Sequence, residues 1–140
     1  NVCNLKDAYS SEFDETCEDP VIDIMKEQKY LEQMGGTMRL GAYPCKLAKD
    51  SLAYKIYKQE DISERHRHRY EFNNDYRDIV EKNGMNISGQ SPDNVLVEVV
   101  EIPDHPFYIG VQYHPEFKSR PDKAQPIFRE FVKIAIELQK

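Results

Sequence analysis

Two residues with complementary acid–base chemistry lie at the end of a predicted strand, in the tripeptide His114-Pro115-Glu116. The preceding residues, Phe107 to Tyr113, are mostly β-branched or aromatic and alternate as in a buried strand. Because proline cannot donate to a strand ladder, pairing should stop at Pro115 and leave its neighbours at the rim of the sheet. An extended backbone would point His114 and Glu116 to the same side, where the carboxylate can fix the imidazole tautomer and raise its basicity. The pair is therefore predicted to be the base and orienting acid of a nucleophilic triad; the alternative is a surface histidine near an unrelated glutamate.

A second cluster of reactive side chains lies in residues 64–73, which read ERHRHRYEFN. An extended backbone would place its arginines on one side and its histidines and aromatics on the other. Three guanidiniums on one face suggest an anion site. The two histidines could ligate a metal, but the arginines between them would repel a dication, so no metal site is predicted. Nucleic-acid binding and a strand whose arginines pair with carboxylates remain alternatives. The arginines are Arg65, Arg67 and Arg69, and the opposite side carries His66, His68, Tyr70 and Phe72.

The three cysteines, Cys3, Cys17 and Cys45, do not have the surroundings of an activated nucleophile. Their number is odd and the sequence has no C-x-x-C pair, which argues against a disulfide framework and a thiolate zinc site. Cys3 has no neighbouring glycine to form the sharp turn that exposes a nucleophile above a sheet. Free thiols in a reducing compartment are expected, so the predicted location is cytoplasmic.

The composition fits one globular domain covering residues 1–140. A hydrophobic fraction of 39% supplies a core, which argues against disorder. The net charge of -6 has the wrong sign for a protein that mainly binds nucleic acid or a membrane surface. No apolar run approaches the ~20 residues of a membrane span. From the charge and the lack of such a run, we expect neither a nucleic-acid nor a membrane partner.

Alternating helical and strand patterns predict an α/β fold, whose elements must position these side chains. We expect helices over residues 20–28, 52–57 and 75–83 and from Pro126 onwards, and strands over 37–41, 45–48, 65–73, 95–102 and 107–113. The apolar side chains of the last helix recur with a 3.6-residue period and should pack on a sheet. They are Ile127, Phe128, Phe131, Ile134, Ala135 and Leu138.

Four segments together resemble the CTP synthase family, in the C-terminal part of its class I glutamine amidotransferase domain. They are residues 35–41 (GGTMRLG), 64–73, 89–98 and 111–121. The His-Pro-Glu element alone is shared with other class I amidotransferases, whereas the first two segments point to CTP synthase. The resemblance implies an amidotransferase-like mixed sheet flanked by helices and incomplete at the N-terminus.

By this resemblance, glutamine is hydrolysed at a Cys-His-Glu triad. The ammonia passes to a synthetase domain of the same polypeptide, which uses ATP and Mg²⁺ to aminate UTP to CTP, in a homotetramer. His114 and Glu116 match the family's base and orienting carboxylate. Arg69 matches the residue that holds the glutamine α-carboxylate, Glu12 the one that receives the α-amino group, and Tyr70 lies at the edge of the same pocket.

The family's nucleophile lies in a Gly-x-Cys-x-Gly elbow, which these 140 residues do not contain. We therefore expect a fragment of a longer polypeptide, inactive alone, with no nucleophile, metal or cofactor of its own. Two alternatives remain. One is an amidotransferase-like module without a nucleophile that serves regulation or assembly, and the other is an unrelated anion-binding domain that uses residues 65–69.

Overall fold

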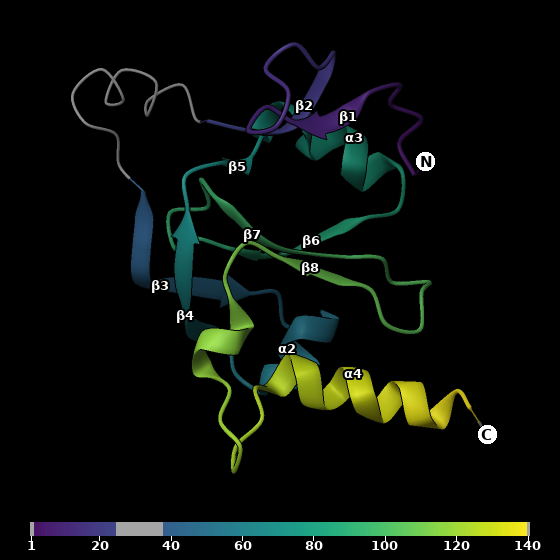
Figure 1. Cartoon of the computed structure of the whole chain (residues 1–140). Coiled ribbons are helices and arrows are strands. Elements are labelled where there is room, and N and C mark those ends of the chain that lie inside the picture. The colour runs from purple at the N-terminus through teal and green to yellow at the C-terminus, as the bar shows by residue number, and fades with distance from the viewer. Residues whose placement is uncertain (1, 25–37, 140) are drawn as a thin grey trace.

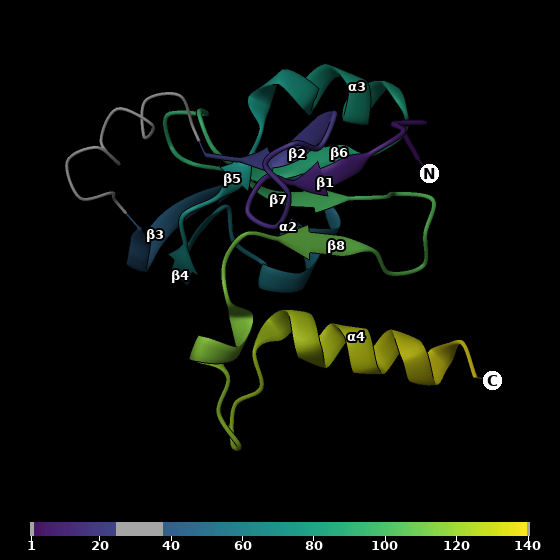
Figure 2. The ribbon, with the colours of Figure 1, turned by 45° about the horizontal axis from the view of Figure 1, so that its top comes forward.

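The computed structural model describes residues 2–24 and 38–139, which form two sheets with helices on both sides (Figures 1 and 2). The larger sheet is antiparallel, in the order β4-β3-β6-β7-β8, and the smaller has the order β1-β2-β5, with β1 and β2 parallel. The predicted mixed sheet flanked by helices is confirmed. The strands are β1 (Ala8–Ser10), β2 (Asp19–Asp23), β3 (Arg39–Leu47), β4 (Asp61–His68), β5 (Glu71–Phe72), β6 (Asn86–Gln90), β7 (Val97–Glu101) and β8 (Ile109–Val111).

Strand β4 shows the alternation predicted for the arginine-rich segment. Ile62, Glu64 and His66 are buried, whereas Arg65 and Arg67 are exposed. The strand pairs with β3 from Arg39 opposite His68 to Lys46 opposite Asp61. This long register directs the histidines inward and the arginines outward, as a period of two requires.

The core lies between the larger sheet and the helices α2 (Leu52–Tyr57) and α4 (Pro126–Glu137). The predicted inward face of the 107–113 strand is confirmed, since all four of its side chains join this core. Figure 2 shows α3 (Arg77–Lys82) on the opposite side of the molecule. The inward residues of the strand are Phe107, Ile109, Val111 and Tyr113.

The helix predicted from Pro20 is wrong, because Asp19–Asp23 form strand β2. The carbonyl of Val21 accepts a hydrogen bond from the Asn73 backbone N–H, and Ile22 lies opposite Phe72 of β5. Pairing on both sides with β1 and β5 outweighed the helical spacing, and β-branched valine and isoleucine suit a strand. The rest of that prediction, residues 25–28, lies outside the described residues, as do residues 35–37 of the resemblance.

The two short strands predicted at 37–41 and 45–48 are one strand, β3. Gly41 adopts a φ of 103°, which only glycine reaches easily, yet it keeps its place opposite His66. Pro44 lies opposite Ser63 without ending the pairing. Both residues are thus accommodated inside a strand, so reading them as breaks was incorrect.

Helix α4 begins at Pro126 as predicted, but most of its apolar face does not pack on a sheet. Ile127 is buried, and Phe131 touches Phe107 with ring centroids 5.5 Å apart. In Figure 1 the helix extends from its first turn beside α2 towards the C-terminus, and most of its apolar side chains are exposed. The exposed side chains are Phe128, Phe131, Val132, Ile136 and Leu138.

Candidate active site

Strand β8 delivers His114 to the rim of the larger sheet. The neighbours Tyr113 and Pro115 are both buried and anchor the chain on either side. The backbone N–H of His114 donates to the carbonyl of Arg65 at 2.8 Å, which joins this rim to β4. Pro115 then starts a 3₁₀ turn, Pro115–Lys118. The predicted end of pairing before proline is therefore observed.

The imidazole of His114 and the carboxylate of Glu116 are in contact, with Nδ1 and Oε1 2.7 Å apart. The contact forms across the 3₁₀ turn rather than along an extended strand, because the turn folds Glu116 back onto the ring. The hydrogen bond from His114 lowers the pKa of Glu116. Phe117 stacks on the imidazole at a centroid distance of 4.9 Å. Since Nδ1 is engaged, Nε2 is the nitrogen left to exchange a proton with a reacting group.

A buried polar web holds the strand beneath His114. The hydroxyl of Tyr57 donates to Oε1 of Glu64 at 3.0 Å and lies 3.2 Å from the hydroxyl of Tyr113. The side-chain amide of Gln125 also donates to Glu64, at 3.3 Å, while its carbonyl caps α4. Burial raises the pKa values of both tyrosines, so they remain neutral. The web ties β4, α2 and α4 to the residue that precedes His114.

The predicted glutamine-binding residues lie on neighbouring elements. Arg69 and Tyr70 are half-buried in the link between β4 and β5. Glu12 is exposed in the turn that follows β1, which belongs to the same small sheet as β5. Within residues 2–24 and 38–139, its carboxylate makes no hydrogen bond or ion pair. The structure thus brings His114 and Glu116 into direct contact.

A buried ion-pair network that was not predicted from the sequence lies at this end of the sheet. Nη2 of Arg39 lies 2.7 Å from Oε1 of Glu98, and Nη1 lies 3.4 Å from both Glu71 oxygens. The amide of Gln112 donates to Glu71 at 3.2 Å. Burial raises the pKa of Glu71 to about 7, despite the opposing charge of Arg39. Carboxylates scattered among strand residues usually face solvent, so the sequence carried no signal for this network.

The two histidines of β4 are hydrogen-bonded to one another. Nδ1 of His66 lies 2.8 Å from Nε2 of His68, and Nδ1 of His68 lies 3.0 Å from the Tyr70 carbonyl. Burial, together with the charge of Arg39, lowers the pKa of His66 to about 3 and that of His68 to about 4. In the described part of the chain, no three potential ligands gather into a metal site.

Two of the cysteines have thiols poorly suited to nucleophilic attack. Burial raises the pKa of the core residue Cys45 to about 12, and the pKa of Cys17 is also raised by burial and by Asp14. Cys3 is half-buried, with its sulfur 3.9 Å from the carbonyl of Ile79. A thiolate is the reactive form, so a raised pKa works against attack.

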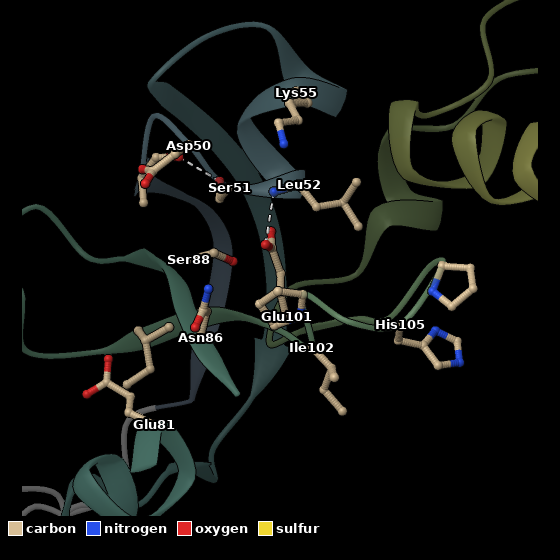
Figure 3. A pocket seen from close by; sticks show the side chains of 14 residues that line it. Asp50, Ser51, Leu52, Lys55, Glu81, Asn86, Ser88, Glu101, Ile102 and His105 are labelled. Carbon is tan, nitrogen blue, oxygen red and sulfur yellow. Dashed lines mark hydrogen bonds between the residues drawn. The ribbon is translucent and has the colours of Figure 1, made fainter. Parts of the chain in front are cut away.

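A pocket of about 340 Å³ lies among residues of α2, β6 and the end of β7, and His114 is not part of its lining (Figure 3). Glu101 forms part of its wall, and its carboxylate accepts the backbone N–H groups of Leu52 and Ala53 at 2.9 and 2.6 Å. Glu101 therefore caps the start of α2 and is already hydrogen-bonded. Because Glu101 lies opposite Ile109, at the start of β8, this pocket is separate from the candidate active site.

The fold and the paired acid and base at the strand end fit the class I glutamine amidotransferases. The model of that family, glutamine amidotransferase class-I, matches residues 9–134, and the chain belongs to this family. Within the described residues, no helix is both long and apolar enough to cross a membrane.

Within this family the chain is similar to CTP synthases. It is 60% identical over 136 residues to the CTP synthase of Geotalea uraniireducens, and 61% identical over 129 residues to that of Methanosphaera stadtmanae. These matches cover 97% and 92% of this chain but 26% and 24% of the relatives' length. It also matches the solved glutaminase domain of Trypanosoma brucei CTP synthase with bound acivicin, at a TM-score of 0.89 and 38% identity. That match covers 98% of this chain and 53% of the solved one.

Proposed function

We propose that this chain is the distal part of the glutaminase domain of a CTP synthase. The observation that carries the proposal is the contact of 2.7 Å between His114 and Glu116 at the sheet rim, in a chain that resembles CTP synthases over nearly its whole length. In this proposal the polypeptide contains a synthetase domain that binds ATP and Mg²⁺ and aminates UTP. A homotetramer and a cytoplasmic location complete the proposal.

The acid–base pair can serve both steps of glutamine hydrolysis. Glu116 accepts a hydrogen bond from Nδ1–H of His114, so the unprotonated Nε2 can take the proton of a cysteine thiol supplied by residues outside these 140. The thiolate then attacks the side-chain amide carbon, and the imidazolium returns the proton to the departing ammonia. Water, activated by the same nitrogen, cleaves the thioester to glutamate. The carboxylate of Glu116 stabilises the imidazolium in each step.

Arg69 and Glu12 supply the two charges that a zwitterionic amino acid requires. A guanidinium can bind the α-carboxylate through two parallel hydrogen bonds, and a carboxylate can receive the α-ammonium. Without both partners, a charge entering a partly desolvated pocket would lose several kcal/mol of hydration without compensation. The half-buried position of Arg69 next to Tyr70 supports its assignment to the carboxylate.

The test compares glutamine with free ammonia as nitrogen donor in the complete polypeptide that contains this chain. Wild-type protein should convert UTP to CTP with either donor when ATP and Mg²⁺ are present. His114→Ala should lower the glutamine-dependent rate by roughly 10² to 10⁴-fold, because it removes the general base, and leave the ammonia-dependent rate nearly intact. Equal losses with both donors would make His114 structural. If the wild-type protein forms CTP from ammonia but not from glutamine, the result would favour a regulatory module.

A further inference from the structure

The ring of His68 braces the backbone of the segment that carries Arg69. Its Nδ1 lies 3.0 Å from the carbonyl oxygen of Tyr70, two residues further along the chain. The side chain of His68 is only 15% exposed, so water does not replace this contact freely. The hydrogen bond closes a small loop around Arg69, whose backbone lies between the ring and the carbonyl that it holds.

The proton positions of the two histidines follow from their partners. A carbonyl oxygen only accepts, so Nδ1 of His68 must carry a proton, and in a neutral ring Nε2 is then the acceptor. Nδ1 of His66 lies 2.8 Å from that nitrogen and must therefore donate to it. Nε2 of His66 is left without a proton and, among the described residues, without a hydrogen-bond partner, 3.8 Å from Glu98. By donating to Nε2 of His68, His66 favours the tautomer of His68 that carries its proton on Nδ1 over the one that carries it on Nε2.

The far side of the same loop is fixed by a buried ion pair. Glu71 follows Tyr70 directly and is held by Arg39 and by the amide of Gln112. Gln112 follows β8 directly and lies two residues before His114, in the segment that carries the catalytic base. The Arg69 backbone is therefore fixed on one side by His68 and on the other by a network that reaches the His114 strand.

We propose that His68 is a positioning residue for glutamine: its Nδ1–H, in the tautomer selected by His66, holds the Tyr70 carbonyl and thereby aims the Arg69 guanidinium at the substrate α-carboxylate. The inference rests on the proposed function, in which Arg69 binds glutamine. His68 itself does not touch the substrate. A misaimed guanidinium weakens glutamine binding and leaves the chemistry of the ammonia-dependent reaction untouched, since that reaction does not use the glutamine site.

The matched variants are His68→Leu and His68→Asn in the complete polypeptide, since leucine and asparagine have nearly the same size and only asparagine offers a donor near the position of Nδ1. We expect His68→Leu to raise KM for glutamine by about tenfold, the effect of one lost hydrogen bond to a buried carbonyl. His68→Asn should stay within about threefold of wild type. In both variants kcat at saturating glutamine and the ammonia-dependent rate should change by less than about threefold.

Equal rises in KM for both variants, or wild-type KM in both, would overturn the inference. The proposed function is tested by a separate measurement: it fails if the wild-type protein makes no CTP from glutamine. If wild-type protein uses glutamine and His68→Leu leaves KM unchanged, only the positioning role fails. Backbone hydrogen–deuterium exchange supplies a second readout: His68→Leu should speed exchange in residues 69–72 and leave β7 protected. His68→Asn should not.

If His68→Leu disturbs the whole domain, exchange in β7 will also be faster. A variant of His66 then provides the test. His66→Phe keeps a ring in the core but cannot select the tautomer of His68. We expect it to raise KM for glutamine by about threefold with β7 still protected, since the His68 proton is then shared between its two nitrogens. An unchanged KM in His66→Phe with an intact β7 would overturn the inference.

Discussion

Two pairs of side chains, one of a histidine with a glutamate and one of two histidines, have the same two-residue spacing but opposite surroundings in this protein. His114 and Glu116 lie at the rim of the sheet, with side chains 38% and 54% exposed. His66 and His68 lie on β4, with side chains 0% and 15% exposed. The first ring has a carboxylate as its partner and can take up a proton. In the second pair the rings hydrogen-bond to one another and to the Tyr70 carbonyl, with the carboxylates of Glu71 and Glu98 3.5 and 3.8 Å away. Burial and the nearby charge of Arg39 keep these rings neutral, so the pair holds backbone instead.

The difference shows that spacing does not determine the role of a histidine. His66 and His68 point to one side because they lie two residues apart on a strand, whereas a 3₁₀ turn brings Glu116 to His114. Desolvation then disfavours the charged ring, whereas a contacting carboxylate favours it. Arg69 lies between the two pairs, in the link that follows β4. The comparison predicts that changes to the exposed pair alter chemistry and changes to the buried pair alter positioning.

The largest expected effect concerns the exposed pair in isolation. The 140-residue chain alone should show no glutaminase turnover, because a base and its orienting acid without a nucleophile have nothing to activate. The measurement is glutamate release, together with mass spectrometry after incubation with acivicin. Covalent trapping at Cys3, Cys17 or Cys45 would contradict this prediction.

Arg69→Lys in the complete polypeptide tests the residue between the pairs. Lysine keeps the charge but loses the planar fork that can bind a carboxylate with two hydrogen bonds. We expect kcat/KM for glutamine to fall by roughly 10 to 100-fold, which corresponds to about 1.5 to 3 kcal/mol for a lost charged hydrogen bond. Steady-state kinetics with glutamine, and with ammonia as the control, measure the effect. Unchanged glutamine kinetics would remove Arg69 from the site.

Glu116→Gln should give the pattern of His114→Ala more weakly. An amide can still hold the ring by a hydrogen bond, but it cannot stabilise the imidazolium by charge. Because the pair is half-exposed and screened by water, we expect a loss of about tenfold with glutamine and little change with ammonia. A glutamine-dependent rate equal to wild type would show that Glu116 does not assist His114.

The smallest expected effect concerns the buried pair His66 and His68, whose rings should not titrate in the ordinary pH range of histidine. With pKa values of about 3 and about 4, both rings should stay neutral between pH 5 and 8. Exchange of the imidazole C2 hydrogen, followed by mass spectrometry of the peptide that contains both rings, should show no step near pH 6.5. Such a step in the native protein would contradict the prediction. Unfolding the protein in urea should make the step appear. The groups that face the pair are Arg39, Tyr43, Tyr70, Glu71, Glu98, Tyr113 and His114.

These shifts also fix the sign of the stability change with pH. The pKa values of His66 and His68 lie below their unfolded value of 6.5, so their stabilisation is present above pH 6.5 and is lost as the pH falls toward 4 and 3. Glu71 acts oppositely: its pKa is raised from 4.5 to about 7, so its contribution is present below pH 4.5 and is lost as the pH rises through 7. The two effects oppose one another between pH 4.5 and 6.5.

The sequence by itself determined the features that depend on local pattern and chemistry. Strand alternation placed the inward face of β8, and proline with an apolar period placed the start of α4. Proline after a strand and the residue types of His114 and Glu116 were enough to predict an acid–base pair at the rim, although the contact forms across a 3₁₀ turn that was not predicted. The resemblance of several segments was enough to indicate the family, since a match of many residues at fixed spacing does not arise from composition.

Only the tertiary structure decided what neighbours from distant segments impose. Pairing with β1 and β5 made residues 19–23 a strand despite their helical spacing. Arg39 is buried with Glu71 and Glu98 because β3 pairs with β4 and β7 lies close by. No local sequence pattern predicts this network. Burial also distinguishes the environment of His66 and His68 from that of the more exposed His114. Desolvation depends on everything that surrounds a group, and a sequence window holds only the group's own neighbours along the chain.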